Sequence, residues 1–218
     1  LLFRYMSIGL NVVQGIVLVP LYLKFIPLDV YGVWLASGNL LSWISASDPG
    51  LTTILQQQVA LKYGNNQLSS VGKIICSGLI CSFAVFFIAI SIGLTISYFL
   101  SSWLTIPGYV DSVLIMNAFR VAVIGTSLMI FSFSITAISQ GLLGSLGPGI
   151  INIGINIFSI FLTVFLLYQG YGLMSLSYSL LFNGICYCAL HTVYLFWRVY
   201  YEKIVVSFSK SNLLEISN

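Results

Sequence analysis

Residues 121–197 read VAVIGTSLMIFSFSITAISQGLLGSLGPGIINIGINIFSIFLTVFLLYQGYGLMSLSYSLLFNGICYCALHTVYLFW and contain no Asp, Glu, Lys or Arg. About 20 apolar residues cross the hydrocarbon core of a bilayer as a helix. This run is therefore too long for one crossing and must turn back at least once. It lacks the alternation of lipid-facing and lumen-facing residues that marks a barrel strand. We therefore expect its crossings to be helical.

The composition of the whole chain agrees with a membrane location. Of 218 residues, 59% are hydrophobic and 6% are charged, whereas a soluble domain carries about 25% charged residues. So few charges exclude a water-soluble enzyme and a disordered segment. The net charge of +3 is too small for a surface that tracks nucleic-acid phosphates. The sequence predicts an all-α polytopic membrane protein, with the lipid bilayer and no nucleic acid among its partners.

Polar turns divide the chain into six predicted transmembrane helices, which together form one lobe over residues 1–197. Their predicted bounds are 5–23, 31–55, 73–100, 112–139, 150–168 and 173–197. Residues 198–218 are expected to be a cytoplasmic connecting tail. Because the chain begins at Leu1 and stops in a polar stretch, we expect a fragment or a truncated reading frame.

The basic residues predict an orientation, because Lys and Arg concentrate in cytoplasmic loops. Only Lys24 falls on one side of the predicted lobe. Six fall on the other side: Arg4, Lys62, Lys73, Arg198, Lys203 and Lys210. We therefore expect both termini in the cytoplasm and a multi-pass location in the plasma membrane.

Asp48 is one of two charged residues that lie well inside the predicted crossings. Such a group costs about 2.5–3.5 kcal/mol on insertion scales, so it usually has a function or a partner. Pro49 follows it and cannot bond a carbonyl of the preceding turn, and Gly50 adds conformational freedom. Asp48, Pro49 and Gly50 are therefore a candidate hinge or coupling site. The alternative is that Asp48 caps a broken helix.

Arg120 is the second of these charged residues, and it shares a helix face with Asn117, three residues earlier. A guanidinium group presents a fork that fits phosphate oxygens. Arg120 and Asn117 are therefore candidate substrate-binding residues. Alternatively, Arg120 extends to the outer interface or pairs with a neighbouring polar group.

Asn152, Asn156, Ser159 and Thr163 mark one polar face of the fifth predicted crossing. Asn152 and Asn156 are candidate substrate contacts, although such stripes also hold membrane helices together. His191, the only histidine, is expected to be a hydrogen-bonded interior residue. The cysteines match no zinc or redox spacing. We expect no metal, cofactor or catalytic residue, and no enzyme activity.

Residues 21–78 hold a series of short motifs: Leu21-Tyr22-Leu23, Asp29-Val30-Tyr31-Gly32-Val33-Trp34, Ser42-Trp43, Asp48-Pro49-Gly50-Leu51, Gln57-Gln58-Val59-Ala60 and Tyr63-Gly64. This series resembles the first two helices and the first cytoplasmic loop of bacterial polysaccharide flippases. These are the O-antigen and lipid-linked oligosaccharide translocases of the multidrug/oligosaccharidyl-lipid/polysaccharide exporter superfamily. Gln140, Gly141, Asn152 and residues 170–173 fit the family pattern more loosely.

The resemblance implies the N-terminal lobe of a two-lobed exporter, whose C-terminal lobe is missing here. Such a protein would flip undecaprenyl-diphosphate-linked oligosaccharide across the bacterial inner membrane for export of O-antigen or capsule. Arg120 and Asn117 would then contact the diphosphate, and the segment 48–50 would bend as the lobe rocks. Two alternatives stay open. One is a multidrug/cation antiporter of the same superfamily, although residues 5–23 lack its usual acid. The other is a non-transporting membrane protein or an inactive truncated product.

Overall fold

The computed structural model describes residues 2–45, 50–104, 108 and 111–206. Within these residues the regular structure is entirely α-helical, which confirms the predicted fold class. Seven helices follow one another: α1 (Leu2–Phe25), α2 (Leu28–Ser45), α3 (Leu51–Gly64), α4 (Leu68–Trp103), α5 (Ser112–Gly141), α6 (Leu146–Tyr168) and α7 (Met174–Tyr201).

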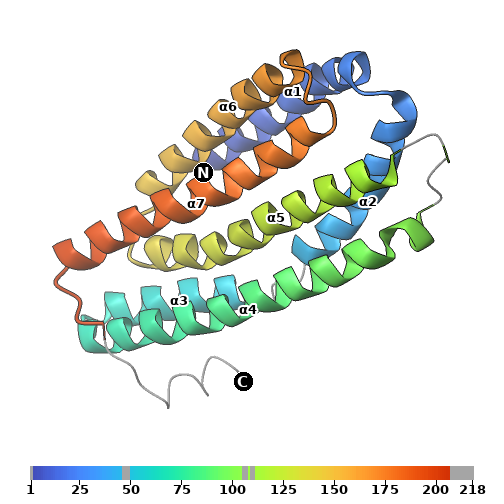
Figure 1. Ribbon diagram of the computed structural model, residues 1–218. Coiled ribbons are helices and arrows are strands. Elements are labelled where there is room, and N and C mark those ends of the chain that lie inside the picture. Colours follow the sequence, from blue (N-terminus) through green and yellow to red (C-terminus); the bar gives the residue numbers. More distant parts are fainter. Residues whose placement is uncertain (1, 46–49, 105–107, 109–110, 207–218) are drawn as a thin grey trace.

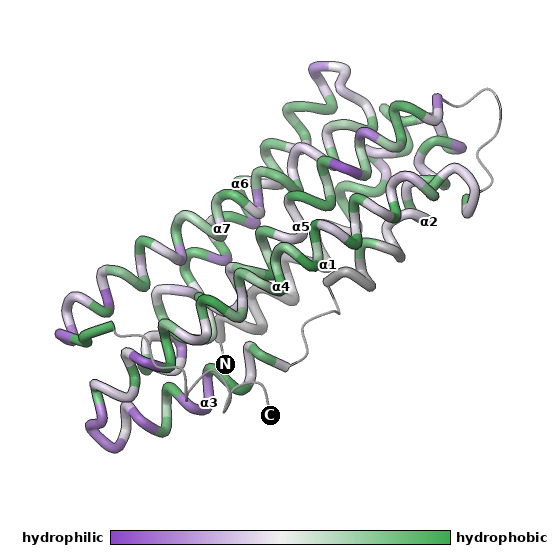
Figure 2. Tube along the Cα trace, turned by 60° about the horizontal axis from the view of Figure 1, so that its bottom comes forward, coloured by the Kyte–Doolittle hydropathy of each residue, from purple (hydrophilic) through white to green (hydrophobic). Residues whose placement is uncertain are grey.

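Four of the described helices, α4 to α7, are long and apolar enough to cross a membrane. Hydrophilic residues gather near the two ends of the bundle, and hydrophobic residues line its length (Figure 2). The chain is therefore a multi-pass membrane protein. The other two predicted crossings coincide with α1, of which the described stretch Gly15–Phe25 is apolar, and with the segment that holds α2 and α3. Six crossings thus stay a prediction.

Helix α5 lies at the centre of the bundle (Figure 1). It packs against α7 on one flank and against α2, α3 and α4 on the other, while α6 packs on α7 and α1 packs on α6. The α3–α4 turn, the α5–α6 turn and the end of α7 lie at one end of the bundle (Figure 1). The α1–α2 and α6–α7 turns lie at the opposite end. Helices α2 and α3 therefore run in one direction, from the α1–α2 turn to the α3–α4 turn, and the other helices alternate in direction with them, as membrane crossings do.

The α5–α7 contact depends on glycine at two positions. A Cβ atom on Gly125 would lie 2.5 Å from the carbonyl oxygen of Leu180, and one on Gly184 would collide with the carbonyl oxygen of Gly125. Small residues let membrane helices approach this closely, and packing then replaces the hydrophobic drive that lipid cannot supply. These glycines therefore set the distance between the two central helices.

The second predicted crossing, 31–55, is divided between α2 and α3. Helix α2 ends at Ser45 and α3 begins at Leu51, after Gly50 in the left-handed conformation (φ 86°). A residue with a Cβ atom rarely adopts this backbone conformation. Gly50 thus permits the change of direction, whereas the predicted hinge residues Asp48 and Pro49 lie outside the described residues.

Candidate functional site

A row of polar contacts joins α6 to α7. Asn152 Oδ1 lies 2.9 Å from His191 Nε2, and Asn156 Oδ1 accepts a hydrogen bond from the Tyr187 hydroxyl at 3.2 Å. On α7 the polar positions recur every four residues, about one per turn, at Ser179, Asn183, Tyr187 and His191. The polar face predicted on α6 therefore meets a matching polar face on α7.

His191 is fully buried in this row. Its ring stacks on Tyr187 with a centroid distance of 5.7 Å and an interplanar angle of 5°. Because the partner atom on Asn152 is an oxygen, Nε2 acts as the donor. The other ring nitrogen, Nδ1, is buried without a hydrogen-bond partner. The expectation of a hydrogen-bonded interior histidine is therefore confirmed.

Thr163 and Ser179 continue the row toward the α6–α7 turn. Their hydroxyl oxygens lie 2.7 Å apart. Ser179 Oγ also lies 2.8 Å from the carbonyl oxygen of Ser175, and Thr163 Oγ1 lies 2.8 Å from that of Ser159. Each hydroxyl has one proton, so a chain from Thr163 through Ser179 to Ser175 uses both protons. With this set of hydrogen bonds, the carbonyl oxygen of Ser159 keeps only its backbone hydrogen bond within α6.

A cavity of about 210 Å³ lies beside this hydroxyl pair, between α1, α2, α6 and α7. Six of its lining residues have a polar group and two are leucines: Tyr22, Trp34, Ser159, Thr163, Ser179, Asn183, Leu176 and Leu180. None of these eight side chains is charged. Asn183 Oδ1 is buried without a hydrogen-bond partner. This is a polar cavity near the α1–α2 and α6–α7 turns, and it is the best candidate site in the described part of the chain.

Arg120 lies elsewhere, on the α4 flank of α5. Its Nε donates to Ser97 Oγ at 3.2 Å, and its guanidinium carbon lies 5.1 Å from the centre of the Tyr98 ring. Ser97 Oγ in turn donates to the carbonyl oxygen of Leu94. Arg120 is partly buried, and Asn117 on the same helix is exposed. Arg120 therefore pairs with a neighbouring polar group, Ser97, which is the alternative to a substrate contact that the sequence left open.

The structure thus separates the predicted substrate-binding residues into two groups. Asn152 and Asn156 lie together in the α6–α7 row, while Arg120 and Asn117 lie on α5, and Arg120 contacts α4. Among the described residues, α4 does not pack against α6, which carries Asn152 and Asn156. Sequence reasoning missed the cavity residues Tyr22, Trp34 and Asn183. The four-residue repeat on α7 could have indicated Asn183, but nothing in the sequence indicates that α1 and α2 meet it.

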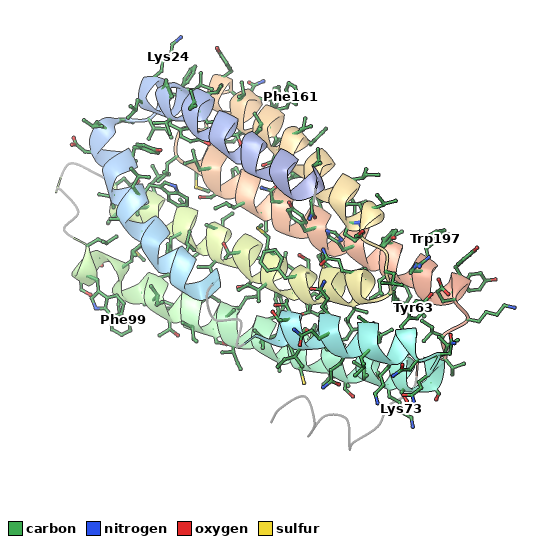
Figure 3. The ribbon with its side chains drawn as sticks, turned by 180° about the vertical axis from the view of Figure 1, so that it is seen from behind. Lys24, Tyr63, Lys73, Phe99, Phe161 and Trp197 are labelled. Atoms are coloured by element: carbon green, nitrogen blue, oxygen red, sulfur yellow. The ribbon has the colours of Figure 1, made fainter. Side chains whose placement is uncertain are left out.

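A second polar cluster lies at the opposite end of the bundle from Lys24, near Tyr63 and Trp197 (Figure 3). Arg198 Nη2 donates to the carbonyl oxygen of Leu142 at 3.0 Å and forms an ion pair with Glu202 at 3.1 Å. Tyr63 on α3 hydrogen-bonds to Glu202. This cluster ties together α3, the α5–α6 turn and the end of α7. Among the described residues, no three of the types His, Cys, Asp and Glu gather to hold a metal ion.

Comparisons with protein-family models, with curated proteins and with solved structures find no match for the chain. The polar cavity, the α6–α7 row and the placement of Arg120 are therefore the observations from which a function is inferred.

Proposed function

We propose that the chain is the N-terminal lobe of an exporter that flips undecaprenyl-diphosphate-linked oligosaccharide across the bacterial inner membrane. The glycan would serve O-antigen or capsule synthesis, and both termini would lie in the cytoplasm. The motifs over residues 21–78 support this proposal by their resemblance to polysaccharide flippases. A C-terminal lobe of the same kind would complete the transport path.

The single observation that carries the proposal is the polar cavity between α1, α2, α6 and α7. Polar groups are costly in the hydrocarbon region, and they are tolerated where they pair or line a water-filled space. A flippase needs such a space, because the glycan and diphosphate must pass the bilayer while the lipid tail remains in it.

Arg120 is the proposed contact for the diphosphate. Its bond to Ser97 uses Nε, so that bond leaves the two terminal nitrogens of the guanidinium fork for phosphate oxygens. Arg120 lies roughly 12 Å along the helix from the start of α5, at about 1.5 Å per residue. This depth corresponds to a head group that has entered the bilayer from the outer side.

The test is flipping of a fluorescent undecaprenyl-diphosphate-linked glycan in liposomes that contain the intact protein. Arg120→Ala should lower the flipping rate about tenfold or more, because a hydrogen bond to a charged group is worth about 1.5–3 kcal/mol. Lys24→Ala, a change of the same charge near the α1–α2 turn, should leave the rate unchanged. Equal rates for Arg120→Ala and the wild type would remove Arg120 from the mechanism. A wild-type protein that does not flip the lipid would contradict the function.

A further inference from the structure

We infer that the cavity between α1, α2, α6 and α7 binds one neutral sugar ring of the transported glycan. This inference rests on the proposed function and deepens it, because it divides the substrate between two places. The sugar ring would occupy the cavity, and the diphosphate would lie outside it.

The absence of charge from the cavity wall sets the class of ligand. None of the eight lining side chains is charged. Burying a diphosphate there would leave its charges unpaired, which is far more costly than burying a neutral polar group. The wall therefore selects against phosphate and for an uncharged ligand rich in hydroxyl groups.

The hydrogen-bonding groups of the wall match such a ligand. Asn183 lines the cavity and has a buried amide oxygen with no partner, so a ligand hydroxyl that reaches it would supply the missing hydrogen bond. Thr163 and Ser179 present hydroxyl oxygens that use their protons along the chain to Ser175. These oxygens can accept further bonds. A sugar hydroxyl both donates and accepts, so it can satisfy Asn183 and the hydroxyl pair.

The aromatic side of the cavity matches the apolar face of a sugar ring. Tyr22 from α1 and Trp34 from α2 line it, and Trp34 is buried. A pyranose ring has carbon-bound hydrogens on one face, which pack on an aromatic ring, and hydroxyl groups at its edge. Aromatic residues with a polar tip suit sites that are partly apolar and partly wet.

The size of the cavity limits the ligand to one ring. Its volume of about 210 Å³ is below the roughly 300–1,000 Å³ of pockets for drug-sized ligands. A longer glycan would therefore place a single residue in the cavity.

Two isosteric variants and a matched control test the inference. Asn183→Leu removes the amide, whose oxygen has no hydrogen-bond partner in the protein. Thr163→Val removes a cavity hydroxyl. Thr95→Val removes an exposed hydroxyl on α4 that lies 2.8 Å from the carbonyl oxygen of Ser91, as Thr163 Oγ1 lies 2.8 Å from that of Ser159. Thermal unfolding of each variant establishes that it is folded.

Binding of methyl glycosides of glucose, galactose, mannose and N-acetylglucosamine is measured by calorimetry on the intact protein in nanodiscs. At least one glycoside should bind saturably. Asn183→Leu and Thr163→Val should each weaken that binding roughly two- to tenfold, the value of one hydrogen bond, and Thr95→Val should not change it. No binding by any glycoside, or equal binding by all four proteins, would overturn the inference.

A transport measurement separates this inference from the proposed function. Asn183→Leu should slow flipping of the glycan-linked lipid and leave flipping of sugar-free undecaprenyl diphosphate unchanged. Equal slowing of both lipids would overturn the inference while the proposed function stands. Saturable, Asn183-dependent glycoside binding by a wild-type protein that flips neither lipid would overturn the proposed function alone.

Discussion

Tyr63 lies beside Glu202 and Arg198 at the end of the bundle that we predict to be cytoplasmic. Burial, and then the hydrogen bond to Glu202, raise the pKa of its phenol above 10. The charge of Glu202 acts in the same direction, and Arg198 acts against it. The folded state therefore favours the neutral phenol, which bonds the carboxylate that Arg198 also pairs with.

The raised pKa of Tyr63 predicts a pH dependence of stability. The stabilisation is fully present below the unfolded pKa of about 10 and is lost as the pH rises through the higher folded pKa. Between pH 9 and 11 the unfolding temperature of the wild type should therefore fall more steeply than that of Tyr63→Phe. The other tyrosines are common to both proteins and serve as the control. Parallel curves would contradict the role of this hydroxyl.

At this scale the sequence predicted the character of single residues better than their partners. The stripe Asn152–Asn156 and the interior histidine followed from helical spacing and from the cost of polar groups in lipid. The contacts of Arg120 with Ser97 and Tyr98 could not be predicted. They depend on the rotation of α4 about its own axis, which packing sets.

Among the elements, α5 and α7 form the central pair of the bundle, and their close approach depends on Gly125 and Gly184. The carbonyl oxygen of Gly125 occupies the space that a Cβ atom on Gly184 would need. Backbone cannot yield as a flexible side chain does, so any larger residue must push the helices apart.

Gly184→Ala should lower the free energy of unfolding by about 1–3 kcal/mol, the usual cost of overpacking. Gly154→Ala on α6 is the matched control, because nothing lies within 4 Å of the added Cβ atom. That change should be neutral or stabilising by up to about 1 kcal/mol, since alanine favours helix. Unfolding in a denaturing detergent measures both. Equal stability of the two variants would show that α5 and α7 do not meet at these glycines.

The position of the break between α2 and α3 could be predicted from the sequence, but the packing of α3 after the break could not. Proline and glycine at 49 and 50 indicated where the helix stops, and Gly50 has the left-handed backbone conformation that a glycine permits. The packing of α3 on both α4 and α5 could not be predicted, because it depends on contacts between residues far apart in the chain.

For the whole molecule, the account depends on the path of the chain through the membrane. Helices α4 to α7 are long and apolar enough to cross it, and successive turns lie at opposite ends of the bundle (Figure 1). The charge-free runs 74–110 and 121–197 predicted this much, because so many residues without charge are not found on the surface of a soluble domain. The neighbours of each helix could not be predicted, since lipid-facing and protein-facing surfaces are both apolar. Phe99 and Phe161, for example, are exposed on the outside of the bundle (Figure 3).

The two ends of α4 offer the most direct test of this path. Asn66, in the turn before α4, and Ser102, near its C-terminal end, are both exposed. Single cysteines are placed at each position after the four native cysteines, which are free, are replaced by serine. A membrane-impermeant maleimide is applied to intact cells, and permeabilised cells serve as the control. The account predicts labelling of the cysteine at position 102 and none at position 66 until the cells are permeabilised. Labelling at position 66 but not at position 102, or equal labelling of both in intact cells, would contradict it.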